Sequence, residues 1–170
     1  FVKNSFAGPL LKKEISAINL IVKNKKEPVT CIIGGSKIST KINVITSLIK
    51  KINNLIIVGA MANNFFIYKN LRVGKSLIEE NTKEIIKNIY KKAEENNCKI
   101  LIPEDCMVGS SFKSSGIKKK LNTIEDNDMI LDIGPETIKN IKHTIDQSNT
   151  VMWNGPAGYF ENSNFIKGTM

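Results

Sequence analysis

Short apolar runs alternate along the chain with longer stretches in which every third or fourth residue is apolar. Continuous apolar runs of strand length are typical of strands buried on both faces of a sheet. The predicted strands are residues 29–33, 55–58, 99–102, 130–133 and 150–153. The predicted helices are residues 11–22, 38–52, 81–97 and 136–146. This alternation predicts a doubly wound α/β fold, in which helices cover both faces of one parallel sheet.

Two parts of the chain stand outside this pattern. The segment 113–120 is rich in Ser and Lys and has no apolar period, so we predict a surface loop there. His143 lies in the middle of a predicted helix, between Lys142 and Thr144, and away from the strand ends. We interpret it as a surface histidine rather than a catalytic base.

The length of 170 residues fits a single domain, and no apolar run approaches the ~20 residues of a membrane span. The net charge of +9 would ordinarily suggest a nucleic-acid partner. However, 24 of the 25 basic residues are Lys, only Arg72 is Arg, and the chain is equally biased toward Ile (27) and Asn (20). Bidentate base and phosphate contacts favour Arg, so we expect no nucleic-acid partner.

Three cysteines, Cys31, Cys98 and Cys106, are odd in number and lack the spacing of zinc ligands. They predict neither a disulfide framework nor a zinc site, and they fit a reducing cytoplasm. The sequence starts without Met and ends without a tapering tail, so we expect it to be part of a longer chain.

The first candidate site follows the first predicted strand. Gly34 and Gly35 allow a tight turn into a helix, and a helix N-terminus attracts phosphate. Lys37 and Lys41 are four residues apart, which predicts that they share one face of that helix. The segment is either a phosphate site or a solvated basic face. It is not a Walker loop, because the spacing of that motif is absent.

Two further strand ends are candidates, because ligands of open α/β sheets bind at the carboxyl ends of the strands. The turn Asn154-Gly155-Pro156 can present an amide side chain, and Glu161 follows at a separation suited to a ribose hydroxyl. The alternative is an ordinary turn with a surface Glu161. We interpret the third junction, 131–135, as a plain strand end.

Five segments together resemble the phosphoglycerate kinase family. They are AGPLLKKE at 7–14, GGSKISTK at 34–41, VGKSLIEE at 73–80, ILDIGPET at 130–137 and WNGPAGYFE at 153–161. The resemblance covers essentially all 170 residues and implies a Rossmann-like nucleotide domain. It implies that residues 1–9 end an interdomain hinge and that residues 10–170 belong to the C-terminal domain, truncated at its C-terminal end. The family transfers a phosphoryl group between 1,3-bisphosphoglycerate and ADP, with Mg2+, in cytoplasmic glycolysis.

The resemblance also implies roles for particular residues. Lys37 would be the catalytic residue that meets the transferring phosphoryl group, and Lys41 would hold nucleotide phosphate. Asn154 would orient the phosphate chain, and Glu161 would bind the ribose hydroxyls. The adenine and ribose slot would be lined by Gly35, Gly59, Phe112, Leu131 and Pro156.

The chain departs from the family pattern at several points. Val58 and Ala60 stand where the family usually has glycines, and we expect their side chains to narrow the base pocket. The residues before Phe112, Gly109-Ser110-Ser111, also differ from the usual sequence. The family's later GGGD segment, which serves the metal, is absent, so no residue is assigned to metal and Mg2+ is expected to bind through ATP or ADP.

The resemblance further implies a monomer whose other substrate, 1,3-bisphosphoglycerate or 3-phosphoglycerate, binds to an N-terminal domain outside these residues. The chain by itself is therefore expected to be inactive. Two alternatives remain open: a stand-alone nucleotide-binding module without catalysis, and a basic nucleic-acid-binding domain. Neither a membrane nor a nucleic acid is an expected partner.

Overall fold

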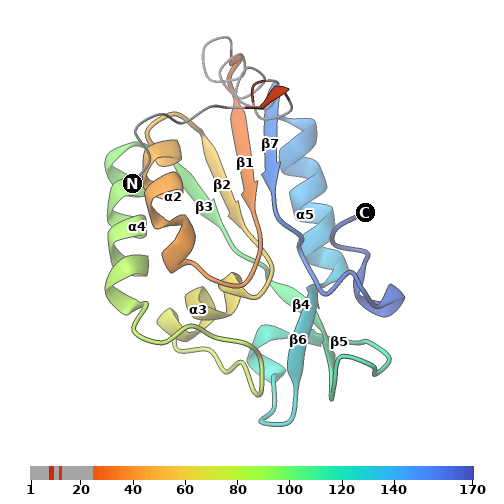
Figure 1. The fold of residues 1–170 in the computed structure, drawn as a ribbon. Helices are drawn as coiled ribbons and strands as arrows, with labels where there is room; N and C mark the ends of the chain where they lie inside the picture. The colour runs from red at the N-terminus through yellow and green to blue at the C-terminus, as the bar shows by residue number, and fades with distance from the viewer. Residues whose placement is uncertain (1–7, 10–11, 13–24) are drawn as a thin grey trace.

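The computed structural model describes residues 8, 9, 12 and 25–170. The predicted helix at 11–22 and most of the proposed hinge therefore lie outside the described residues. The larger sheet has four strands in the order β3-β2-β1-β7, and every neighbouring pair is parallel (Figure 1). Its strands are β1 (Val29–Ile33), β2 (Asn54–Ile57), β3 (Lys99–Leu101) and β7 (Thr150–Asn154).

Helices cover both faces of this sheet, as the apolar pattern predicts. The helices are α2 (Ile42–Ile49), α3 (Met61–Tyr68), α4 (Lys83–Glu95) and α5 (Pro135–Asp146). Alternate side chains of β1 point to opposite faces, so Cys31 and Ile33 pack in the core with α2 and α4, whereas Ile32 packs in the core with α5. Figure 1 shows α2 and α4 on one side of the sheet and α5 on the other. The doubly wound α/β class is confirmed.

A second sheet corrects two sequence predictions. It is antiparallel, in the order β5-β4-β6, and consists of β4 (Asp105–Gly109), β5 (Ile117–Lys120) and β6 (Met129–Ile133). The run 130–133 is a strand, but its expected place in the parallel sheet is wrong, because an apolar run does not specify the direction of its partner.

The prediction of a surface loop throughout 113–120 is also wrong, because β5 occupies 117–120. This edge strand is held by backbone pairing with β4 and by Lys119, whose Nζ lies 2.8 Å from Asp128 and 2.8 Å from Glu125. Because this strand is stabilised by pairing and by an ion pair rather than by buried apolar side chains, its sequence has no apolar pattern from which a strand could be predicted.

Two elements, α3 and β4, have no sequence prediction. Six consecutive residues of α3, from Met61 to Phe66, are buried, so the helix has little polar face to reveal its period. Strand β4 begins with a buried Asp105. The elements are completed by three 3-10 turns: η1 (Ser39–Lys41), η2 (Leu121–Thr123) and η3 (Ser163–Phe165).

Asp105 caps helix α5 from a neighbouring strand. Its carboxylate accepts the backbone N–H groups of Glu136 (3.1 Å) and Thr137 (2.8 Å) and the Thr137 hydroxyl (2.7 Å). The residue that precedes α5, Gly134, has no side chain to do this, and a Cβ there would lie 2.3 Å from Asp105 Cγ. The helix therefore depends on a tertiary contact for its N-terminal hydrogen bonds.

We expect Asp105→Ala to lower the free energy of unfolding at pH 7 by about 2 kcal/mol, since it removes charge-assisted bonds to the helix N-terminus. Burial raises the pKa of Asp105, but hydrogen bonds from Thr137 and Glu136 and the nearby Lys118 lower it to a net value below its ordinary 3.8. The stabilisation is therefore present above the unfolded pKa and is lost as the pH falls through the folded pKa.

Urea unfolding of wild type and Asp105→Ala across this pH range checks the prediction, and the two curves should converge in acid. Asp126→Ala, at an exposed position, is the matched control and should change stability by less than about 0.5 kcal/mol. A pH-independent difference would show that Asp105 acts only through packing.

In the part of the chain that the structure describes, no helix is both long and apolar enough to cross a bilayer. Cys31, Cys98 and Cys106 all lie in described segments, and each is buried and free of a disulfide. Burial raises the pKa of the Cys31 and Cys106 thiols to about 12 and that of Cys98 to about 11. His143 is exposed on α5.

Candidate functional site

Three strand ends meet at one edge of the parallel sheet. The chain leaves β1 through Gly34 and Gly35, β2 through Gly59, and β7 through Gly155 and Pro156. A Cβ on Gly34 would lie 2.1 Å from the Pro156 carbonyl oxygen, and one on Gly59 would lie 2.7 Å from the Gly35 nitrogen. Only glycine permits these backbone contacts. Strands β1 and β7 are neighbours, and the helices connected to them, α2 and α5, lie on opposite faces of the sheet. The carboxyl ends of these two strands therefore form the topological switch point of the sheet, which is where ligands of open α/β sheets bind.

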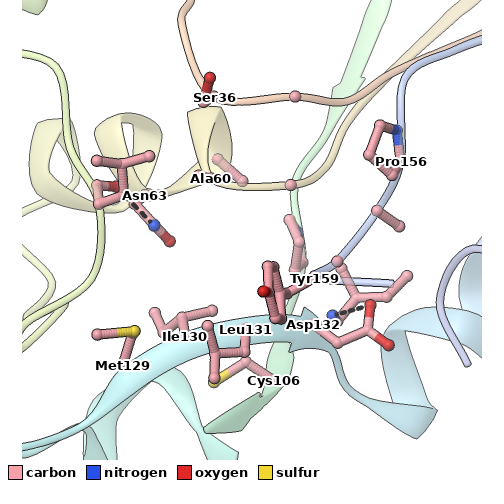
Figure 2. A pocket seen from close by; sticks show the side chains of 18 of the residues that line it. Ser36, Ala60, Asn63, Cys106, Met129, Ile130, Leu131, Asp132, Pro156 and Tyr159 are labelled. Atoms are coloured by element: carbon pink, nitrogen blue, oxygen red, sulfur yellow. Dashed lines mark hydrogen bonds between the residues drawn. The ribbon is translucent and has the colours of Figure 1, made fainter. Parts of the chain in front are cut away.

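A cavity of about 510 Å3 opens beside these strand ends. Helix α3, strand β6 and the segment 156–161 contribute to its wall, and Figure 2 shows Ala60 and Asn63 facing Ile130 and Leu131 across the space. Six of the nine predicted site residues line it: Gly35, Gly59, Phe112, Leu131, Pro156 and Glu161. The fold therefore gathers residues that are up to 126 positions apart in the sequence into one wall.

Lys41 and Asn154 meet at the switch point. The Lys41 ammonium donates hydrogen bonds to the Gly34 carbonyl oxygen and to Asn154 Oδ1, both at 2.7 Å. An ammonium has three N–H donors, so among the described residues these two bonds leave one for a ligand. Glycines border the ammonium: added Cβ atoms on Gly35 and Gly155 would lie 3.5 and 3.3 Å from Nζ. Burial lowers the pKa of Lys41.

Lys37 does not share a helix face with Lys41, so that prediction is wrong. The chain bends on either side of Lys37, at residues 35–36 and 38, the 3-10 turn η1 follows at Ser39–Lys41, and α2 begins only at Ile42. Lys37 is exposed and is not part of the cavity wall. It lies beside Glu79, whose pKa is lowered first by its hydrogen bond with Ser39 and further by the charge of Lys37. The loop that precedes α4 therefore stabilises this bent segment through the hydrogen bond between Glu79 and Ser39.

The far wall is aromatic. The rings of Phe112 and Tyr159 lie 4.8 Å apart at 50°, and the Asn162 amide donates a hydrogen bond to the Phe112 carbonyl oxygen at 2.9 Å. The unusual residues before Phe112 thus do not displace it from the wall. Glu161 belongs to the same wall and is exposed.

Val58 does not narrow the cavity, contrary to expectation. Its side chain is fully buried in the core under α5, with Ile32 and Ile133, on the other face of the sheet. Ala60 does line the cavity and contributes one methyl group to it. The two residues that replace family glycines therefore act differently, because the chain turns at Gly59 between them (φ +69°) and Ala60 already stands at the N-terminus of α3.

The junction 131–135 is more than a plain strand end, because Leu131, Asp132 and Ile133 all line the cavity. Asp132 is 2% exposed and accepts N–H bonds from Ile133 and Gly168, each at 2.9 Å. Burial raises its pKa to about 6. The Asp132 carboxylate therefore links the C-terminal segment to β6. In the sequence, an acidic residue near the end of an apolar run is the signal that could have indicated this role.

Among the described residues, no three His, Cys, Asp or Glu side chains are close enough together to hold a metal ion. The described donors therefore do not fit a metal site made by protein side chains alone. The chemistry that this site offers is an apolar slot of base size, a carboxylate at its rim and an ammonium–amide pair at its mouth.

Comparisons with known proteins identify the family and agree with the fold. The sequence model of the phosphoglycerate kinase family matches residues 1–170. Phosphoglycerate kinase of Wolbachia pipientis wMel is 43% identical over 167 residues, and that of Zymomonas mobilis is 38% identical over 168 residues. Each match covers 98% of this chain and 42% of the relative, so the chain spans less than half the length of these relatives.

Solved structures agree. Phosphoglycerate kinase from Coxiella burnetii superposes with a TM-score of 0.88 at 34% identity, over 96% of this chain and 42% of that one. The enzyme from Pyrococcus horikoshii shares the fold, with a TM-score of 0.76 at 24% identity and coverage of 95% and 42%. Because the family model matches all 170 residues and the fold superposes on a solved member of the family, this chain belongs to the phosphoglycerate kinase family.

Proposed function

We propose that these residues form the ADP/ATP site of a glycolytic kinase that transfers a phosphoryl group between 1,3-bisphosphoglycerate and ADP. The observation that carries this proposal is the Lys41–Asn154 pair, which stands at the switch point beside an apolar cavity. A nucleotide needs both features: an apolar slot for the base and a cation with fixed geometry for the phosphates.

In this proposal the nucleotide lies along the cavity wall. The base packs between Leu131 and the Gly59–Ala60 turn, and the ribose hydroxyls reach Glu161. The phosphates extend to Lys41, whose remaining N–H donates to a phosphate oxygen, while Asn154 holds the ammonium in place. Lys37, exposed on the bend before α2, neutralises charge on the transferring phosphoryl group. Phosphoryl transfer depends on such positioning and neutralisation more than on a covalent catalyst.

The other components of the reaction are proposed to come from outside the described residues. Residues 1–9 would end an interdomain hinge, residues 10–170 would belong to the C-terminal nucleotide domain, and a further domain would bind the phosphoglycerate. Mg2+ would bind through the nucleotide phosphates, where it neutralises charge. We place the enzyme in the cytoplasm and propose that it acts as a monomer.

We expect Lys41→Ala to weaken ADP binding by about 1.5–3 kcal/mol, the range for a hydrogen bond to a charged group. Calorimetric titration of the protein with ADP measures the loss. Lys139→Ala, which removes an exposed lysine from α5, is the charge-matched control and should leave the affinity unchanged. Equal affinity for ADP in wild type and Lys41→Ala would remove this site from the proposal.

A further inference from the structure

One polar atom of the cavity wall has no hydrogen-bond partner in the part of the chain that the structure describes. Asn63 of α3 is 0% exposed and lines the cavity. Figure 2 shows its amide directed from α3 into the space above β6. Its Nδ2 donates a hydrogen bond to the Leu77 carbonyl oxygen at 2.9 Å, but Oδ1 has no hydrogen-bond partner among the residues that the structure describes.

The bond to Leu77 fixes which end of the amide faces the cavity. A backbone carbonyl can only accept a hydrogen bond, so the NH2 group must face Leu77 and the oxygen must face away from it. Buried acceptors without a donor are rare in folded proteins. An unpaired oxygen at this position is therefore suited to a donor that arrives with a ligand.

The surroundings of Asn63 restrict what that donor can be attached to. The wall is mostly apolar and includes Phe66, Met129 and Ile130, with Lys75 as its one cationic side chain among the described residues. A charged donor such as an ammonium would lose its hydration there, and the carboxylate of Asp132 lies across the space from Asn63 (Figure 2). A neutral N–H group on a flat, largely apolar ring loses little hydration free energy there, and it gains a hydrogen bond to Asn63 Oδ1.

We propose that Asn63 Oδ1 accepts a hydrogen bond from the exocyclic 6-amino group of adenine and thereby makes the site selective for 6-aminopurine nucleotides. This inference rests on the proposed nucleotide function. In adenosine the 6-amino group is at the end of the base opposite the bond to ribose. With the ribose near Glu161 and the phosphates at Lys41, that end points toward α3, and Figure 2 shows Asn63 and Pro156 on opposite sides of the cavity.

The next residue of α3 provides an internal control. Asn64 is also buried (2% exposed), and its Oδ1 accepts the Glu79 N–H at 3.0 Å, which leaves its Nδ2 without a partner among the described residues. It is not part of the cavity wall. Replacing Asn64 by Leu makes the same side-chain change in the same helix as replacing Asn63, but at a position outside the cavity wall.

The test compares ADP with purine riboside 5′-diphosphate, which has hydrogen in place of the 6-amino group, by calorimetric titration of the protein. Wild type should bind ADP about tenfold more tightly, the size of one buried hydrogen bond. Asn63→Leu should reduce this preference to less than about twofold, because it keeps the volume and removes the acceptor. Asn64→Leu should keep the tenfold preference, whatever stability it loses.

Equal affinity of wild type for the two ligands would overturn the inference, and this measurement needs no variant to fold. A preference that survives in Asn63→Leu would also overturn it. If ADP binds in a Lys41-dependent way without any preference, the inference fails and the proposed function stands. If ADP does not bind at all, both fail.

Discussion

The 170 residues alone are expected to show no turnover of 1,3-bisphosphoglycerate in a coupled assay, even where they bind ADP. Holding donor and acceptor in line at near-contact distance supplies ~7–11 kcal/mol of the barrier to such a transfer. The described residues provide a cavity and the Lys41–Asn154 ammonium–amide pair for the nucleotide side. Lys37 and Lys41 can neutralise a phosphate, but in the proposed division of roles a further domain holds and aligns the second substrate.

The informative comparison is with the double variant Lys37→Ala, Lys41→Ala, which removes both ammonium groups. The two chains should be indistinguishable from each other in the assay, and a full-length member of the family should give a strong signal under the same conditions. Turnover by the 170 residues above the level of the double variant would show that they hold both substrates, which contradicts the division of roles proposed above.

Gly34→Ala is expected to cost at least about 3 kcal/mol of folding stability and to abolish ADP binding. The new Cβ would lie 2.1 Å from the Pro156 carbonyl oxygen and 2.9 Å from that of Gly155. Both are backbone atoms, so no side-chain rotation can relieve the contact. The ends of β1 and β7 must separate, which pulls Asn154 away from the Lys41 ammonium.

Chemical denaturation measures the stability loss, and ADP titration measures the site. Gly8→Ala is the matched control, because a Cβ there would meet no atom within 4 Å among the described residues. It should leave both measurements unchanged. Native-like stability of Gly34→Ala would mean that the two strand ends can move apart without cost, and that the close approach does not hold the site together.

The parallel sheet and its helices could be predicted from the sequence because each depends on local periodicity. The apolar runs of β1 and β2 are buried, and those of the edge strands β3 and β7 are only partly so. Helices α2, α4 and α5 each have a distinct apolar side. The glycines after β1 and β2 and the Asn154 turn mark the strand ends. The motif resemblance added residue roles, and all of these roles stay predictions.

The second sheet, α3 and the bends on either side of Lys37 could not be predicted in this way. Strand β5 is held by pairing and by the ion pair of Lys119 with Asp128, which no apolar period reports. Helix α3 is buried almost all round, so its period is masked. The spacing of Lys37 and Lys41 indicates a shared face only if both are helical, and the helix begins after them.

The sequence by itself therefore determined the fold class, the position of the strand-end turns and, through its motifs, the family. Tertiary structure alone decided which residues form the cavity wall, that Val58 turns away from it, and that Asn63 presents an unpaired oxygen to it. The physical reason is the range of the forces involved. Periodicity and turn geometry act between residues close in sequence, whereas the partner of a buried polar atom is set by segments that meet only when the chain has folded.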